Sequence, residues 1–452
     1  MTLPAPSVVD LSARRSDDAT VAVREIDGRE VVWIELGLTT DLARLTSVMS
    51  EQVVVGAECA LTQHLPIVIE MSTVGVDINE GLPSLHAWGR AAAALVACSG
   101  VVPIVAIVEG PAISGPALLL GVADITVMTE DAYAFVTGPT MVESYTGVAI
   151  DVDELGGAAN HARYTGVATR VVADRAAAVD AVAELLAYLP AHVDEEPPRH
   201  DTDDDEDRFC PEAGAAIPDS STGSYDVRKV AAAIVDDGSL LELRERWAGN
   251  VVTAFATVGG RPVGIVANQP MNLAGTLDIP ASQKAARFVA FCDAFNLPII
   301  TLVDTPGFYP GKDLEWRGMI RHGAQLVFAY ARASVPRICV ILRKSYGGAY
   351  IVMDSNTMGN DLCLAWPWAE LAVMGAGQAA AILQRRATPE ERAAFEADYT
   401  ERLLNPYVAA DRGLVDAVID PADTRREIAA ALAALDDKRE MLVGRKHGNT
   451  PL

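Results

Sequence analysis

An internal repeat constrains the fold of this chain more than any other feature of its sequence. Residues 65–75 read LPIVIEMSTVG and residues 297–307 read LPIITLVDTPG, and residues 102–115 (VPIVAIVEGPAISG) correspond in the same way to residues 335–348 (VPRICVILRKSYGG). Each copy contains two apolar runs typical of buried strands, a helical stretch between them, and a turn that ends in glycine. The repeat indicates that one supersecondary unit occurs twice.

The alternation of strand-like and helix-like stretches through both copies predicts an α/β protein with parallel sheets covered by helices. With 452 residues, half of them hydrophobic, the chain is long enough for two domains with separate cores. We expect a flexible tail at 1–19, an N-terminal domain at 20–193 and a C-terminal domain at 225–452. The segment between the domains, 194–224, is rich in Pro, Gly, Ser and acidic residues, which predicts a linker.

The charge and cysteine patterns argue against several classes of protein. A formal net charge of −25 argues against nucleic-acid binding, which requires clustered lysine and arginine. The six cysteines are scattered and include no CxxC pair, so we expect reduced thiols in a cytoplasmic protein and no metal site. The N-terminus has no apolar stretch after its basic residues, which argues against a signal peptide. The apolar stretch 91–108 is interrupted by Ser99, Gly100 and Pro103, so we expect it to be buried in the fold and not to span a membrane.

Side chains that usually carry catalysis are scarce in this sequence. None of the seven histidines lies in a metal-ligand spacing such as HExxH, and neither a GxSxG elbow nor a GxxxxGK[ST] loop occurs. Asp304 and Asp313 flank a loop at the end of a predicted strand, where loop capping is a commoner role for aspartate than a catalytic pair. Each copy of the repeat does offer a glycine turn at a strand end, at residues 110–116 and 345–350.

Two adjacent backbone N–H groups in such a turn can form an oxyanion hole. Glycine allows a ligand to approach the backbone closely, and a helix N-terminus leaves N–H groups free beside a positive dipole. Tight packing between a helix and a strand also selects glycine. The duplication of the turn at matching places in the repeat leaves both interpretations open.

Several longer stretches resemble one known family, the carboxyltransferase (β) subunits of biotin-dependent acyl-CoA carboxylases of the propionyl-CoA and acetyl-CoA carboxylase type. The matching stretches of the second half are YDVR (225–228), DDGSLLEL (236–243), VANQP (266–270), KAARFVAFCDAFNLPI (284–299), PGFYPG (306–311), RKSYGGAY (343–350), LAWP (364–367) and AVMGA (372–376). The first half is similar more loosely, through NEG (79–81), SGVVPIVAIVEGP (99–111), ADITVMTE (123–130) and FVTGP (135–139).

The resemblance implies two tandem crotonase-like domains, the first on the acyl-thioester side and the second on the biotin side, in a hexamer built as a trimer of dimers. It implies an enzyme that moves a carboxyl group from carboxybiotin to the α-carbon of a short acyl-CoA, through enolates held in backbone oxyanion holes. Biotin would arrive on a biotin carboxylase or biotin carboxyl carrier subunit, since no AMKM-type attachment motif occurs here. A nucleic acid or membrane partner is not expected.

The family's functional positions can be carried over to this sequence. The biotin oxygen would be held by Gly348 and Ala349, and the thioester enolate by Ser114 and Gly115. Further substrate-binding positions are Gly347, Tyr350 and Ile351. Ile351 matches a position in the acyl pocket, where an apolar residue is associated with a broader range of acyl groups that includes acetyl-CoA.

The first half departs from the family pattern, and the departures keep other functions open. The family's DSGGAR-type stretch reads STVGVDINEG at 72–81, where Asp77 replaces an arginine and would repel a CoA phosphate if it faced one. The repeat also places Pro116, which has no N–H, opposite Ala349. The alternatives are decarboxylation of a malonyl-type thioester, action on a carrier-protein-bound thioester, and a degenerate, non-catalytic β subunit that partners an active paralogue.

Overall fold

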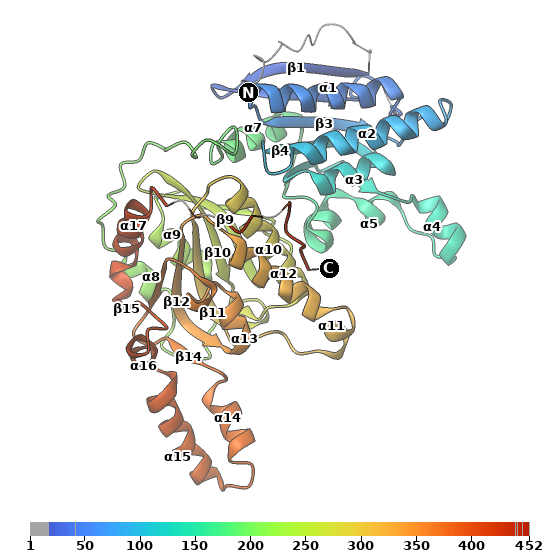
Figure 1. Cartoon of the computed structure of the whole chain (residues 1–452). Helices are drawn as coiled ribbons and strands as arrows, with labels where there is room; N and C mark the ends of the chain where they lie inside the picture. The colour runs from blue at the N-terminus through green and yellow to red at the C-terminus, as the bar shows by residue number, and fades with distance from the viewer. Residues whose placement is uncertain (1–17, 41, 439, 441, 445, 452) are drawn as a thin grey trace. The chain divides into compact units, whose positions relative to one another are not determined.

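The computed structural model describes residues 18–40, 42–438, 440, 442–444 and 446–451. They form two compact units, of which unit 1 ends at Glu196 and unit 2 begins at Pro197 (Figure 1). Residues 1–17 of the predicted tail lie outside the described residues, and the first strand already begins at Ala19.

Unit 1 is built on a seven-stranded sheet with the order β1-β2-β3-β4-β5-β7, to which β6 is added beside β4. The strands are β1 (Ala19–Ile26), β2 (Arg29–Leu36), β3 (Ile67–Thr73), β4 (Ile104–Ile113), β5 (Ile125–Thr129), β6 (Tyr133–Phe135) and β7 (Arg170–Val172). β1 and β2 form an antiparallel hairpin, and all the other pairs are parallel. Parallel neighbours require helical crossovers, which the intervening stretches supply.

The helices of unit 1 cover both faces of this sheet. They are α1 (Ser47–Gln63), α2 (Leu82–Cys98), α3 (Gly115–Val122), α4 (Pro139–Thr146), α5 (Val152–Gly156), α6 (Ala158–Asn160), a π-helical turn at His161–Thr165, and α7 (Arg175–Leu186). Alternate residues of β3, Ile67 and Ile69, join α1 and α2 in one apolar core. Glu70 follows Ile69 and points to the opposite face, where Arg175 of α7 binds its carboxylate.

Unit 2 repeats this plan with an eight-stranded sheet in the order β15-β13-β12-β11-β10-β9-β8, with β14 beside β12. The strands are β8 (Leu241–Leu243), β9 (Val251–Val258), β10 (Arg261–Asn268), β11 (Ile299–Thr305), β12 (Arg337–Tyr346), β13 (Leu362–Ala365), β14 (Glu370–Ala372) and β15 (Ala417–Val418). β8 and β9, like β9 and β10, are antiparallel, and the strands from β10 to β15 pair in parallel.

The helices of unit 2 include a pair that extends away from the sheet. All the described helices of this unit are α8 (Pro211–Ala215), α9 (Val227–Ile234), α10 (Ile279–Ala294), α11 (Lys312–Trp316), α12 (Met319–Arg332), α13 (Gly347–Val352), α14 (Ala376–Leu383), α15 (Pro389–Tyr399), α16 (Pro406–Asp411) and α17 (Thr424–Ala434). Short 3-10 turns lie at Leu273–Gly275, Asn356–Met358 and Pro421–Asp423, and a π-helical turn lies at Thr400–Leu404. α14 and α15 project from the rest of unit 2 (Figure 1). α15 begins with a capping box between Thr388 and Glu391, which fixes its start.

The internal repeat extends to individual backbone contacts. The bridge between Leu45 and Val76 in unit 1 has its counterpart in the bridge between Leu277 and Phe308 in unit 2. The irregularity after Met71 in the β3–β4 pairing recurs after Val303 in the β11–β12 pairing. The prediction of parallel sheets covered by helices is therefore confirmed. The stretch 91–108 forms the end of α2 and the start of β4, and no described helix is long and apolar enough to cross a membrane.

Candidate active site

The turn of unit 2 follows the long buried strand β12. Gly347 has φ +61°, and a Cβ there would lie 3.2 Å from the carbonyl oxygen of Val373, so a side chain would be strained by both backbone angle and space. Gly348 is exposed, whereas its neighbour Ala349 is fully buried. Both lie in the first turn of α13, where backbone N–H groups have no partner within the helix. The turn therefore presents backbone donors at an exposed glycine.

The PGFYPG loop packs against this turn. Two backbone hydrogen bonds hold it, from Leu277 to the Gly307 carbonyl at 3.1 Å and from Tyr309 to the Leu277 carbonyl at 2.9 Å. A Cβ on Gly348 would lie 3.6 Å from the ring of Phe308, which is an ordinary contact distance. The loop thus places an aromatic ring beside the exposed glycine without closing access to its backbone.

Tyr346 anchors the turn from its strand side. Its hydroxyl donates a hydrogen bond to the carboxylate of Glu370 on β14, and burial together with this carboxylate raises the pKa of Tyr346. On the other side of the turn, burial raises the pKa of Tyr350, and Ile351 keeps 38% of its surface exposed. Ile351 is therefore accessible beside the turn, as a pocket-lining residue must be.

Asp304 and Asp313 do not form a catalytic pair. Asp304 is buried and accepts hydrogen bonds from the hydroxyl of Tyr225 at 2.9 Å and from Nε of Arg343 at 3.0 Å. Asp313 has 80% of its side chain exposed and faces Arg317 one helical turn along. The first aspartate holds the fold together and the second lies on its surface.

The turn of unit 1 has the same geometry with different residues. Ser114 has φ +64° and takes the place of Gly347, so Gly115 corresponds to Gly348 and Pro116 to Ala349. The backbone N–H of Ser114 donates to the carbonyl of Phe135 on β6 at 2.9 Å. The structure thus places Pro116, which has no N–H, at the position that Ala349 occupies in unit 2.

The loop that replaces the family's arginine-containing stretch is held by its own acidic residues. The Asp77 carboxylate accepts hydrogen bonds from the backbone N–H of Asn79 at 3.0 Å and from its side-chain amide at 3.1 Å. Glu80 accepts from the backbone N–H of Ser47 at 2.7 Å, at the start of α1. Asp77 therefore serves as a loop cap, the role that aspartate commonly has in such turns.

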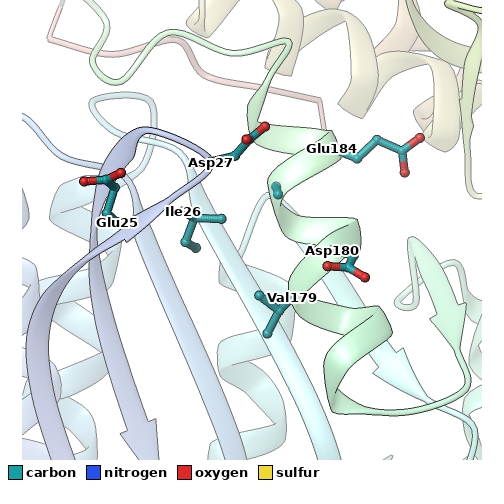
Figure 2. A pocket seen from close by; sticks show the side chains of 7 residues that line it. Glu25, Ile26, Asp27, Val179, Asp180 and Glu184 are labelled. Carbon is teal, nitrogen blue, oxygen red and sulfur yellow. The ribbon is translucent and has the colours of Figure 1, made fainter.

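A separate pocket in unit 1 lies between the β1–β2 turn and α7 (Figure 2). It is lined by Glu25, Ile26, Asp27, Val179, Asp180, Ala183 and Glu184. Its four carboxylates would repel the phosphates of a coenzyme. The residues described by the structure contain no cluster of His, Cys, Asp and Glu that could hold a metal ion, and all six cysteines are buried free thiols.

Fold and site together define a class of protein: two copies of one α/β unit, each with a glycine turn between a buried strand and a helix. The chain belongs to the carboxyl transferase domain family, whose match covers residues 22–450. It is 42% identical over 446 residues to the propionyl-CoA carboxylase beta chain of Saccharopolyspora erythraea, a match that covers 94% of this chain and 82% of the relative. It is 40% identical over 428 residues to the methylmalonyl-CoA decarboxylase subunit alpha of Veillonella parvula, covering 94% and 84%.

The fold is also that of a solved enzyme. The crystal structure of the transcarboxylase 12S hexamer, with methylmalonyl-CoA and methylmalonic acid bound, superimposes with a TM-score of 0.94 at 43% identity and covers 96% of this chain and 85% of that one. The predictions of tandem crotonase-like domains and of a biotin-dependent acyl-CoA carboxyltransferase are confirmed at the level of fold and family.

Proposed function

We propose that this chain is the carboxyltransferase (β) subunit of a biotin-dependent carboxylase and carboxylates the α-carbon of a short acyl-CoA. The observation that carries the proposal is the turn of unit 2, where the exposed Gly348 and the N–H of Ala349 follow a buried strand in a carboxyl transferase chain. The departures from the family pattern lie in unit 1, and there the Asp77 carboxylate is engaged within its own loop.

The proposal assigns a task to each turn. Gly348 and Ala349 hold the biotin oxygen, and the fit is supported by the open side of Gly348, where a Cβ would meet only Phe308 within 4 Å. Biotin, when bound, supplies the carboxyl group. Gly115 donates its N–H to the thioester oxygen and so stabilises the negative charge that develops on the acyl group. Ser114 supplies the backbone shape of the turn, since its N–H is engaged by Phe135.

The remaining parts of the proposal concern binding and assembly. Gly347 and Tyr350 shape the substrate-binding turn, and Ile351 lines the acyl pocket and admits a broader range of short acyl groups that includes acetyl-CoA. The partner is a biotin carboxylase or biotin carboxyl carrier subunit that brings the biotin. The chain forms a trimer of dimers in the cytoplasm. The hexamer of the 12S relative supports the assembly, and the buried free thiols support the cytoplasmic location.

The test is carboxyl transfer from methylmalonyl-CoA or malonyl-CoA to free biotin by the purified chain. Ala349→Pro removes one backbone donor and introduces the residue that the first copy of the turn already tolerates as Pro116. We expect this variant to lose transfer by about 10²-fold or more, the usual effect of removing one oxyanion donor. Ala349→Gly is the matched control, because it changes the same residue but keeps its backbone N–H. Equal activity of both variants would contradict the proposal.

Decarboxylation of a malonyl-type thioester is a second candidate. It is favoured by the Veillonella parvula relative, which is a subunit of a methylmalonyl-CoA decarboxylase. Release of CO₂ from methylmalonyl-CoA in the absence of biotin, unaffected by Ala349→Pro, would replace the first candidate with this one.

A further inference from the structure

The turn of unit 1 lacks a backbone donor that the turn of unit 2 has. In unit 2 both Gly348 and Ala349 carry an N–H at the start of α13. In unit 1 the N–H of Ser114 is bound to the Phe135 carbonyl, and Pro116 has no N–H to offer. Only the N–H of Gly115 is left at this turn, whereas a developing oxyanion is best stabilised by two converging donors.

An indole ring lies against Gly115, the residue that carries this remaining donor. A Cβ on Gly115 would lie 3.0 Å from Cε2 of Trp88 and 3.2 Å from its Nε1, so the ring of Trp88 packs closely against Gly115 and a larger residue there would require the ring to shift. Trp88 comes from α2, which packs against α3. In unit 2 the ring beside the corresponding Gly348 is that of Phe308, which has no polar atom. The copy that lacks a backbone donor thus has a ring with an N–H, and the copy that keeps both donors has a ring without one.

The N–H of Trp88 has no partner in the folded chain. Among the side-chain atoms that the structure describes, Nε1 of Trp88 is buried without a hydrogen bond. Unit 1 does satisfy its other indole, since Nε1 of Trp33 donates to the Glu70 carboxylate at 2.9 Å. A buried donor without an acceptor costs free energy, and native proteins keep few of them. An acceptor supplied by a ligand at the turn explains why this one is kept.

We infer that the indole N–H of Trp88 is the second donor of the unit-1 oxyanion hole. With the N–H of Gly115 it binds the carbonyl oxygen of the acyl thioester and holds the negative charge that develops there. Trp88 is in this sense a catalytic residue, because its Nε1 touches the reacting group. The inference rests on the proposed function, since it names the side chain that completes the acyl-thioester site.

The first experiment measures carbonyl recognition without any carboxyl transfer. The Kd values of propionyl-CoA and of its thioether analogue S-propyl-CoA, which lacks the carbonyl oxygen, are compared by calorimetry for the wild type and Trp88→Phe. We expect the wild type to prefer the thioester and the variant to lose about tenfold of that preference, the value of one hydrogen bond. An unchanged preference in the variant, or no preference in the wild type, would overturn the inference whatever the outcome of the transfer assay.

The second experiment uses transfer from methylmalonyl-CoA to free biotin. Trp88→Phe should lower kcat on the order of 10²-fold with a smaller effect on KM, because the donor acts most strongly on developing charge. Trp33→Phe is the matched control: it removes an indole N–H that has a structural partner, so it should lower Tm and leave kcat unchanged. Trp88→Phe should not lower Tm through hydrogen bonding, since no hydrogen bond is lost. A variant that lost Tm and kcat together would indicate a structural role.

A third variant separates the N–H from the shape of the ring. Incorporation of 3-benzothienylalanine at position 88 keeps the bicyclic ring and replaces the N–H with sulfur. It should reproduce the loss of thioester preference and of kcat seen with Trp88→Phe, even if the smaller phenyl ring disturbs packing. Wild-type behaviour of this variant would overturn the inference. The wild type could prefer propionyl-CoA over S-propyl-CoA through Trp88 and yet transfer no carboxyl group. That result would refute the proposed function and leave the inference on Trp88 standing.

Discussion

Arg175 in unit 1 is surrounded by three carboxylates, of which that of Glu70 is buried. Glu70 on β3 is fully buried and accepts hydrogen bonds from Nε1 of Trp33 and from Nη2 of Arg175, the latter at 2.8 Å. Glu109 on β4 lies 3.1 Å from Nε of Arg175, and Nη2 of the same arginine lies 3.4 Å from Glu35. Burial and the neighbouring Glu70 raise the pKa of Glu109 to about 8 from its ordinary value of 4.5. One carboxyl group of this cluster is therefore protonated at neutral pH in the folded chain.

This proton makes the stability of unit 1 depend on pH. The Glu109 carboxyl group loses its proton near pH 4.5 in the unfolded chain and near pH 8 in the folded chain. Its contribution to the free energy of unfolding is therefore fully present below pH 4.5 and is lost as the pH rises to 8. We expect Glu109→Gln to remove this loss and to be more stable than the wild type by roughly 2 kcal/mol at pH 8. Urea unfolding from pH 5 to pH 8 checks the prediction. Glu184→Gln, in a half-exposed pair with Arg170, should follow the wild-type pH profile, and a Glu109→Gln profile parallel to the wild type would refute the prediction.

At the scale of elements, the two strand–turn–helix units differ in how much strain their turns hold. Ser114 adopts φ +64° and ψ −132°, a conformation that suits glycine, and the matching position in unit 2 is Gly347. Such a backbone costs a non-glycine residue on the order of 1–3 kcal/mol. Ser114→Gly should therefore raise the free energy of unfolding by about 1 kcal/mol after the added entropy of the unfolded chain is subtracted. Gly347→Ser should lower it by at least as much, since its Cβ would also approach the Val373 carbonyl.

Chemical denaturation of the two variants and the wild type measures the difference. Carboxyl transfer is followed in parallel, and Ser114→Gly should retain it, because the N–H of residue 114 stays bonded to Phe135. Two variants that changed stability in the same direction would contradict the conclusion that the strain comes from a non-glycine residue at this position of the turn.

The same elements show how far the sequence alone can predict the fold and the site. Apolar runs and glycine turns repeated along the chain predict both sheets and both turns, because burial periodicity and turn chemistry are local properties. The engagement of Ser114 by Phe135 depends on the pairing of β4 with β6, which no local pattern specifies. The contact of Trp88 with Gly115 depends on how α2 packs on α3, and a tryptophan at helical spacing is otherwise indistinguishable from a core residue.

At the scale of the whole chain, the acidic stretch predicted as a linker at 194–224 is divided between the two units. Its residues from Pro197 onward belong to unit 2, where α8 forms and Cys210 is fully buried. Arg208 donates to the carbonyls of Ala233 and Val235, each at 2.9 Å. The composition of the stretch predicts a solvated connector. The carbonyl groups that Arg208 binds belong to residues outside the stretch, and composition alone cannot predict such contacts. Arg208 also forms an ion pair with Asp204, so the acidic stretch is partly neutralised within unit 2.

Arg425 is the central anchor of this stretch, and its loss should destabilise the whole of unit 2. It is fully buried, donates to the carbonyls of Asp205 and Ile234 at 2.9 and 3.0 Å, and forms an ion pair with Asp236 at 2.7 Å. Arg425→Met leaves Asp236 buried without its cation, so we expect a loss of about 3 kcal/mol in the free energy of unfolding. The neighbouring Arg426 pairs with Asp423 on the surface, and Arg426→Met should cost less than about 1 kcal/mol. Limited proteolysis and urea unfolding distinguish the two: cleavage between 197 and 224 should accelerate in Arg425→Met alone. Equal stability of the two variants would mean that the acidic stretch adds nothing to the free energy of unfolding of unit 2. Its hydrogen bonds in the folded chain would then be no stronger than those it makes to water in the unfolded chain.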